Sequence, residues 1–443
     1  KWNLASFMGR INYNYFGRYL LTVSARYDGS ARLADGHKWV LFPSAALAWR
    51  INEESFMSST SGWLDNLKLR LGFGKTGNSA VDPYQTKGTL SLIRYPFDNG
   101  GTPTIGYAPN AMANSLLTWE TTDQWNLGID FGVLRGRING TIDLYMQNTH
   151  DLLLKRQLPV VSGFPDVLSN VGNPRNKGIE VSINSMNIIS KDFQWTTDLM
   201  LSSNKEEIVE LYNGKNDDIG SKWFIGQPVN VHYDYRKVGI WQNTESDLAE
   251  MAKFAANGTE FAPGDIKIQD VNGDYKITDA DKQILGNPRP KLIASMVNTF
   301  NYKGFDLSVF LYASFGAMLY NDIYAVEHCG RNGGVKVDYW TPNNPTNAYP
   351  RPSIDEERPI YITSTYYEKA DFLRVKTMTL GYTLPKTLTN KFLVEKLRVY
   401  FTNYTGIDPE AAKVNSAGNP ETNGSGFGTP SVSSWIFGIN LTL

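Results

Sequence analysis

The feature that most constrains this sequence is a period-two alternation of apolar and polar residues that recurs along the whole chain. A β-strand points successive side chains to opposite faces, so such alternation predicts strands with one apolar and one polar face. The predicted strands cover residues 4–15, 19–28, 40–51, 66–74, 123–133, 137–147, 177–188, 193–204, 291–302, 305–316, 371–382, 396–402 and 434–443. The fold class is therefore all-β, with about 13 strands in residues 1–443.

Two kinds of β-fold would give this pattern: a soluble sandwich or propeller, and a transmembrane antiparallel β-barrel. Strands of soluble proteins average about 5–6 residues, and the predicted strands are longer. Aromatic residues also recur at the ends of the segments, as they do at the two membrane interfaces of an outer-membrane barrel. Examples are Tyr15, Tyr19, Trp49, Trp125 and Trp435. The sequence favours the barrel, with its apolar side chains facing outer-membrane lipid.

The connections between the strands support the same prediction. Short turns such as those at 16–18 and 303–304 largely alternate with long segments at 75–122, 148–176, 205–290, 317–369 and 403–433. Bacterial outer-membrane barrels have short periplasmic turns and long extracellular loops. They also have an even number of strands, so a count of thirteen leaves two explanations. Either 229–241 is an additional strand, or strands that precede Lys1 are missing; we favour the second.

Composition excludes several classes of function. The 43 Lys and Arg residues balance 44 Asp and Glu residues, which argues against a nucleic-acid partner. No segment approaches the ~18 consecutive apolar residues of a membrane-spanning helix. The single cysteine, Cys329, cannot form an internal disulfide, and the four histidines show no ligand spacing. We find no catalytic constellation and expect no enzyme.

The sharpest local motif is the run from Asp270 to Asp281, which has the spacing of an EF-hand-type loop. Oxygen ligands would come from Asp270, Asn272, Asp274, the carbonyl of Lys276 and Asp281. Two features depart from that pattern: Tyr275 replaces the usual glycine at position 6, and Asp replaces Glu at position 12. The alternatives are a structural Ca²⁺ or similar divalent cation, and a loop of side-chain-capped turns without a metal. No organic cofactor is expected.

Four aromatic residues of the predicted loops, Trp223, Trp241, Tyr339 and Trp340, have two interpretations. They could stack on sugar rings or grip peptide side chains at a binding surface. They could equally pack the long loops together.

Motifs spread over the chain resemble those of the SusC/RagA family of TonB-linked outer-membrane transporters, in particular the C-terminal part of the barrel. The motifs are Arg26-Tyr27-Asp28-Gly29-Ser30, Phe42-Pro43-Ser44, residues 67–78, Trp119-Glu120, Asn170-Val171-Gly172, Gly264-Asp265, Gly286-Asn287-Pro288, residues 302–307, Tyr382-Thr383-Leu384-Pro385 and Leu397-Arg398-Val399-Tyr400. The sequence departs from the family near Asn403, where several residues that the family usually carries are absent.

This resemblance implies a 22-stranded barrel in the outer membrane of a Gram-negative bacterium. It also implies a plug domain and a TonB box, neither of which lies in this chain, and a SusD-like surface lipoprotein as partner. The implied function is TonB-dependent import of an oligosaccharide or glycan, or of a peptide. The alternative is a passive porin or structural barrel.

The barrel hypothesis makes two structural predictions. One set of side chains should face lipid and the other the interior: Leu127, Ile129, Ile142, Leu144, Ile439 and Leu441 outward, Asn126, Asp143 and Asn440 inward. The loops at 75–122, 205–290 and 317–369 should lie outside the cell.

Overall fold

The computed structural model describes residues 2–97, 101, 103–321, 337–353, 358–407 and 433–443, and it divides into two compact units. The first unit comprises residues 1–187 and 197–229, and the second comprises 188–196 and 230–443. Cys329 and His328 lie outside the described residues, as does most of the segment at 403–433. Within the described residues, no helix is long and apolar enough to cross a membrane.

Thirteen long strands make up the main antiparallel sheet of the described residues, in the order in which they follow along the chain. The first unit contains all or most of β1 (Leu4–Tyr15), β2 (Tyr19–Ser30), β3 (Trp39–Arg50), β4 (Leu64–Asn78), β7 (Glu120–Val133), β8 (Ile138–His150), β11 (Asn173–Ile189) and β12 (Phe193–Glu210). In the second they are β17 (Leu292–Tyr302), β18 (Phe305–Phe315), β21 (Phe372–Thr383), β22 (Lys396–Ile407) and β23 (Ser434–Thr442). The prediction of an all-β, antiparallel fold is confirmed.

The segment 229–241 does not add a strand to this sheet. It forms β13 (His232–Tyr235) and β14 (Lys237–Ile240), which pair with β16 (Lys282–Gly286) and β15 (Ile266–Ile268) in two small sheets. The alternative of an additional barrel strand at this position is therefore wrong. β13 and β14 have four residues each and β15 has three, which is too few to extend the long sheet.

The short turns have the positive backbone angles that tight antiparallel connections require. Phe16 and Gly17 have φ of 51° and 70°, and Lys303 and Gly304 have φ of 45° and 90°. Two consecutive residues with positive φ match the right-handed twist of paired strands. Asn14 Oδ1 also accepts a hydrogen bond from Gly17 N at 2.9 Å, which satisfies a backbone donor of the first turn.

The register places the predicted side-chain sets on opposite faces of the sheet. Leu144 lies opposite Leu127, and Ile142 lies opposite Ile129, whereas Asp143 points to the other face. Leu127 is 41% exposed and Leu144 is 47% exposed, although both lie mid-strand in a well-paired region. The apolar face is thus the more exposed face, which is the reverse of a water-soluble sheet. This inversion is what a strand facing lipid requires.

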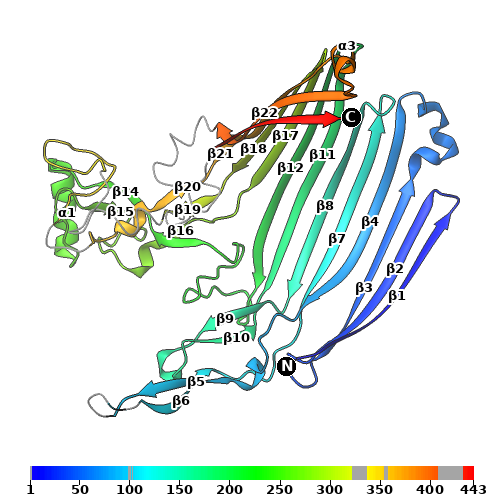
Figure 1. Ribbon diagram of the computed structural model, residues 1–443. Helices are drawn as coiled ribbons and strands as arrows, with labels where there is room; N and C mark the ends of the chain where they lie inside the picture. The colour runs from blue at the N-terminus through cyan, green and yellow to red at the C-terminus, as the bar shows by residue number, and fades with distance from the viewer. Residues whose placement is uncertain (1, 98–100, 102, 322–336, 354–357, 408–432) are drawn as a thin grey trace. The chain divides into compact units, whose positions relative to one another are not determined.

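The long connections fold into small structures of their own. In the first unit they contain the hairpins β5 (Thr89–Tyr95)–β6 (Thr104–Ala111) and β9 (Leu153–Gln157)–β10 (Asp166–Asn170). Both lie at one end of that unit's strands, and the short 3₁₀ helices η1 (Ile51–Glu53) and η2 (Ser55–Thr60) lie at the other (Figure 1). Long and short connections are therefore segregated to opposite ends, as the sequence predicts.

The second unit shows the same segregation. Its long connections carry α1 (Glu245–Ala256), β13 to β16, β19 (Met318–Tyr320), β20 (Tyr367–Lys369) and the 3₁₀ helices η5 (Asp279–Asp281) and η6 (Ile362–Thr365). The short connection between β21 and β22 carries α3 (Lys386–Thr389) and η7 (Asn390–Phe392) at the opposite end of the strands (Figure 1). Two further 3₁₀ turns, η3 (Gln85–Lys87) and η4 (Val160–Ser162), belong to loops of the first unit.

Candidate functional site

The polar face of the sheet in the first unit carries a network of paired charges. Arg70 of β4 lies 2.8 Å from Asp130 of β7 and 3.0 Å from Asp143 of β8, and Lys68 lies 3.1 Å from Asp130. Gly128 lies beside this network, where an added Cβ would stand 2.6 Å from both Arg70 Cζ and Asp143 Oδ1. The sequence therefore has a glycine where the guanidinium crosses the strand.

A second charged pair occupies the polar face of the sheet in the second unit. Arg398 of β22 binds Asp306 of β18 through two parallel contacts, Nε to Oδ1 at 2.8 Å and Nη2 to Oδ2 at 2.5 Å. Bidentate pairs of this kind fix both side chains in orientation. Both networks lie on the polar face of the sheet, and their positive and negative charges nearly cancel there. A neutral arrangement of this kind suits the wall of a polar interior better than a binding site for a single ion.

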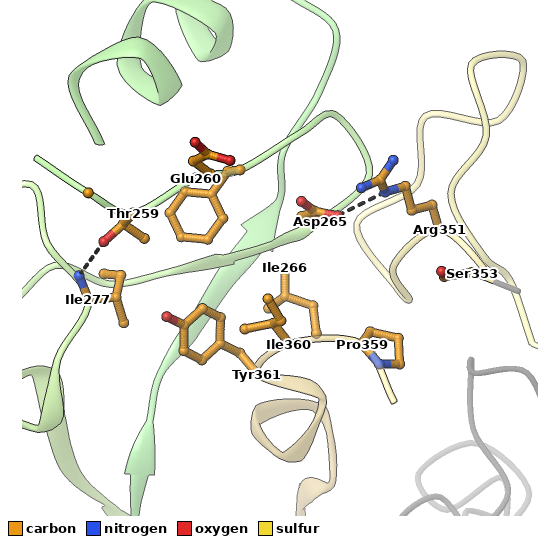
Figure 2. A pocket seen from close by; sticks show the side chains of 12 residues that line it. Thr259, Glu260, Asp265, Ile266, Ile277, Arg351, Ser353, Pro359, Ile360 and Tyr361 are labelled. Atoms are coloured by element: carbon orange, nitrogen blue, oxygen red, sulfur yellow. Dashed lines mark hydrogen bonds and ion pairs between the residues drawn. The ribbon is translucent and has the colours of Figure 1, made fainter. Parts of the chain in front are cut away.

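The loop region of the second unit contains a pocket of about 260 Å³. Its wall is half apolar and half polar, because six of its twelve lining residues have side chains that can form hydrogen bonds: Thr259, Glu260, Asp265, Arg351, Ser353 and Tyr361. The lining includes Glu260, Phe261, Ile266, Arg351, Ile360 and Tyr361. They come from residues 258–277, 351–353 and 359–361, which are distant in sequence and side by side in the fold (Figure 2).

Small hydrophobic cores hold this pocket in place. Ile266 of β15 is 1% exposed and packs with Ile240, Trp340 and Tyr366. The helix α1 packs Met251 and Phe254 against Trp241 in a neighbouring cluster, to which Phe261 adds its ring. The pocket thus has a rigid floor, because its apolar lining belongs to a core that folding must form in any case.

The polar groups of the pocket are ordered by neighbours. Arg351 Nε donates to Asp265 Oδ1 at 2.8 Å, while Asp265 Oδ2 accepts from the backbone N–H of Ala262 at 2.8 Å. Figure 2 shows this pair on one side of the pocket and Thr259 with Ile277 on the other. Burial raises the pKa of Tyr361, so its hydroxyl stays protonated and can donate a hydrogen bond at physiological pH.

The predicted cation loop adopts a compact turn with its own hydrogen bonds. Asp270 accepts from Gly273 N at 2.7 Å and from Tyr275 N at 2.8 Å, and Asp274 accepts from Lys276 N at 2.8 Å. Tyr275 takes φ of 56° and Gly273 takes φ of 75°. The bulky tyrosine thus adopts the left-handed conformation that the sixth position of such a loop needs, despite its steric cost.

The last predicted ligand has a different environment from the others. Asp281 is fully buried and accepts from Val271 N at 2.9 Å and from Thr278 N at 2.8 Å, and it closes the loop as the third residue of a capping box. Asn272 Nδ2 donates to Asp274 Oδ2 at 2.9 Å. Across the described residues, no three His, Cys, Asp or Glu side chains form a group that could hold a metal ion. The carboxylates are satisfied by N–H groups, and the cation site stays a prediction.

The loop aromatics are mostly structural. Trp223 is 7% exposed, Trp241 is fully buried and Trp340 is 6% exposed, each within a separate hydrophobic cluster. Tyr339 alone of the four is exposed, at 45%. The interpretation that these tryptophans pack the loops is the one that the structure supports.

Sequence reasoning missed the residues that form the pocket. Arg351, Ile360 and Tyr361 follow a proline- and asparagine-rich stretch with no alternation and no known motif. The one sequence feature that marks the pocket is Gly264-Asp265, which belongs to the motifs that resemble the SusC/RagA family. Gly264 has φ of 93°, and an added Cβ would stand 2.8 Å from Arg351 Cβ, so this glycine allows residue 351 to approach.

Comparison with known proteins identifies relatives over nearly the whole chain. The model of the family described as "TonB dependent receptor-like, beta-barrel" matches residues 2–404. TonB-dependent receptor P3 of Formosa agariphila is 32% identical over 465 aligned positions, covering 99% of this chain and 45% of that protein. TonB-dependent receptor SusC of Bacteroides thetaiotaomicron is 34% identical over 434 positions, covering 92% and 41%.

A solved structure has the same fold. The structure of the RagAB peptide transporter superposes with a TM-score of 0.80 at 23% identity, covering 99% of this chain and 48% of the matched chain. The chain thus spans less than half the length of these relatives. The resemblance to SusC/RagA proteins that the sequence motifs suggest is confirmed.

Proposed function

We propose, from the premise that this chain belongs to the TonB-dependent receptor-like β-barrel family of the outer membrane, that the protein of which it is part actively imports a nutrient. The family consists of transporters and not enzymes. The observation that carries the proposal is the family match over residues 2–404 on a sheet whose apolar face is exposed. A sheet of this kind is suited to lipid on one side and to a polar passage on the other.

The cargo of this import would be an oligosaccharide or glycan, or a peptide. A SusD-like lipoprotein would enclose the cargo from outside, and the TonB complex would act through an N-terminal part that is not in this chain. The resemblance to SusC/RagA proteins supports both partners. The long connections, which lie together at one end of the strands in each unit, offer the surface that such a lipoprotein would contact.

Energy dependence tests the proposal directly. Deleting the inner-membrane energiser in cells that keep this barrel should abolish uptake of the cognate nutrient. Uptake of a small solute through an unrelated porin serves as the control and should not change. If nutrient uptake continues at its normal rate without the energiser, the protein acts as a passive porin or structural barrel instead.

We also propose that the loop at 270–281 binds Ca²⁺ or a similar divalent cation as a structural element. Asp270, Asn272, Asp274 and the carbonyl of Lys276 lie on one turn whose positive φ values at Gly273 and Tyr275 support the proposal. Asp281 would have to exchange a backbone N–H for the ion. Slower cleavage of this loop by protease in Ca²⁺ than in chelator, for the full-length protein, is the expected result. Equal cleavage rates would exclude a cation.

A further inference from the structure

We infer that the apolar face of the first unit's sheet ends, on its loop side, in a surface that binds the phosphate groups of lipopolysaccharide, the lipid of the outer leaflet. The surface, called the basic belt below, consists of Lys75 of β4, Arg175 and Lys177 of β11, and Lys205 of β12. The inference concerns the lipid around the barrel and not the cargo inside it. It uses the predicted orientation, in which the long loops lie outside the cell.

The register of the strands places the belt at one end of an uncharged surface. Residues paired across antiparallel strands share a face, as do residues two apart in one strand. From the turn end to the loop end, the rows on the face of Leu127 are Val133–Ile138–Ser185, Leu67–Phe131–Gly140–Ile183, Leu69–Ile129–Ile142–Val181, Leu71–Leu127–Leu144–Ile179, Phe73–Trp125–Met146–Lys177 and Lys75–Asp123–Asn148–Arg175. The first four rows carry no charge, and the charges begin at Lys177.

The last row lies at the height where lipid headgroups begin. Asp123 and Val133 are ten residues apart in β7, which is about 33 Å along the strand and about 25 Å across the membrane at the ~40° tilt of barrel strands. This height matches the ~25 Å apolar band of outer-membrane barrels. The rings of Phe73 and Trp125, 4.8 Å apart, lie one row nearer the apolar region, where aromatic residues mark the membrane interface.

Cations outnumber carboxylates on this surface. Asp123 lies 3.8 Å from Lys75 Nζ and 3.2 Å from His150 Nε2. Glu207 lies 3.7 Å from Lys177 Nζ and 2.8 Å from Lys205 Nζ. Two carboxylates thus face the four Lys and Arg residues of the belt, which leaves a formal charge of +2 with the histidine neutral.

Two further carboxylates stand outside the belt. Asp151 follows His150 at the end of β8, and Glu210 ends β12, so both lie farther toward the loops than the charged row. Glu210 accepts a hydrogen bond from Asn173 Nδ2 at 3.4 Å. The positive charge therefore lies between these carboxylates and the apolar rows, next to the position of the lipid.

Arg175 is the belt residue best placed to bind a phosphate. Its Nε donates to Asn148 Oδ1 at 2.8 Å, which holds one edge of the guanidinium against β8. Over the part of the chain that the structure describes, Arg175 forms no ion pair with a carboxylate, and its side chain is partly exposed. A guanidinium held by one edge presents its other N–H groups to the oxygen atoms of a phosphate.

A lipid fits this surface better than a soluble anion does. The apolar rows continue directly into the belt, so acyl chains can cover Leu127 and Leu144 while a headgroup reaches Arg175. The backbones of Lys75 and Arg175 stand three strand spacings apart, which is about 14 Å. That span exceeds one phosphate and favours a large headgroup with more than one, as in lipid A, the anchor of lipopolysaccharide.

Native mass spectrometry of the full-length protein in detergent tests the inference with defined lipids. Diphosphoryl lipid A should bind saturably, and monophosphoryl lipid A and phosphatidylglycerol should bind more weakly. Inorganic phosphate at millimolar concentration should not displace diphosphoryl lipid A. Displacement by inorganic phosphate would show a site for free anions. Equal binding of phosphatidylglycerol would show a general attraction to anionic lipid, and either result overturns the inference.

A pair of double substitutions localises the binding. Arg175→Gln with Lys177→Gln should weaken binding of diphosphoryl lipid A about twentyfold, because each basic side chain near an anionic lipid surface contributes about fivefold. Arg135→Gln with Lys191→Gln is the matched control, since it removes two exposed charges from the short turns before β8 and β12. The control should bind as the unaltered protein does. Equal losses in the two variants would place the lipid elsewhere.

Two further variants test whether charge is the cause. Glu207→Gln should tighten binding of diphosphoryl lipid A severalfold, because it removes the carboxylate between Lys177 and Lys205. Arg175→Lys with Lys177→Arg keeps both charges and should bind within about threefold of the unaltered protein. Weaker binding after Glu207→Gln, or a loss in the exchanged pair as large as in the glutamine pair, would contradict an electrostatic belt.

Discussion

Replacing Asp281 by Asn should loosen the 270–281 loop while leaving the rest of the chain folded. The carboxylate is fully buried, and its two oxygens accept from Val271 N and Thr278 N. Asparagine keeps one oxygen and turns an NH₂ group toward the second backbone N–H. One charge-assisted hydrogen bond is lost, and hydrogen bonds of this kind contribute about 1.5–3 kcal/mol.

Losing that free energy makes local opening of the loop about ten- to hundredfold more favourable, since about 1.4 kcal/mol changes an equilibrium constant by a factor of ten. Hydrogen–deuterium exchange followed by mass spectrometry on the full-length protein measures it. Peptides that cover the 270–281 loop should exchange about ten- to hundredfold faster in Asp281→Asn than in the unaltered protein. Peptides from β17 and β18 should be unchanged.

Asp279→Asn is the matched control, because it makes the same chemical change two residues away on a side chain that is 86% exposed and pairs with Lys282. Its exchange rates should stay close to those of the unaltered protein. Equal effects of the two substitutions would refute the reasoning, since burial and the two backbone contacts distinguish Asp281. Unchanged exchange in Asp281→Asn would show that these hydrogen bonds do not hold the loop.

Three further predictions concern the sheet and its orientation. Leu127→Arg on the exposed apolar face should cost about 2–4 kcal/mol of stability in lipid vesicles, whereas Asn126→Arg on the opposite face should cost much less, as urea unfolding would show. A double-mutant cycle with Asp306→Asn and Arg398→Gln should give a coupling of about 1 kcal/mol or more, because both contacts of the pair are lost together; additive effects would contradict it. Protease added to intact cells should cut within 75–122, 205–290 and 317–369, and cleavage only after lysis would reverse the predicted orientation.

The long strands could be predicted from sequence because one physical rule governs each residue in them. Leu127 and Leu144 alternate with Asn126 and Asp143, and the structure keeps these pairs on opposite faces. Strand ends were less predictable. The strand predicted at 66–74 runs from Leu64 to Asn78, since backbone pairing continues through Gly77 and Asn78 after the apolar alternation has ended.

The pocket could not be predicted, because its residues meet only through tertiary packing. No local pattern links Phe261 to Tyr361, one hundred positions away. The cation loop shows the opposite limit: its spacing was clear, and its turn formed with Tyr275 at positive φ. Spacing alone did not reveal that Asp281 would be directed toward backbone N–H groups, because that depends on the turn at Thr278.

The long strands and the loop region of this chain follow opposite solvation rules. In the long strands, Leu127 and Leu144 are exposed, and the charged Arg70 is paired on the other face. In the loop region of the second unit, Ile266 and Trp241 are buried, as in a water-soluble protein. Apolar side chains are exposed on the strands, where lipid would cover them, and they are buried in the loop region, which water would surround.

A loop region with its own buried core can hold a binding pocket in a fixed shape, whereas an extended loop would pay about 1–2 kcal/mol of backbone entropy for each residue that a ligand ordered. Ile266 serves both purposes, since it packs with Trp340 in the core and lines the pocket. The pocket is therefore formed by folding before any ligand arrives. The lining residues Arg351, Glu260 and Ile360 are exposed, so they can be changed without disturbing the core beneath them.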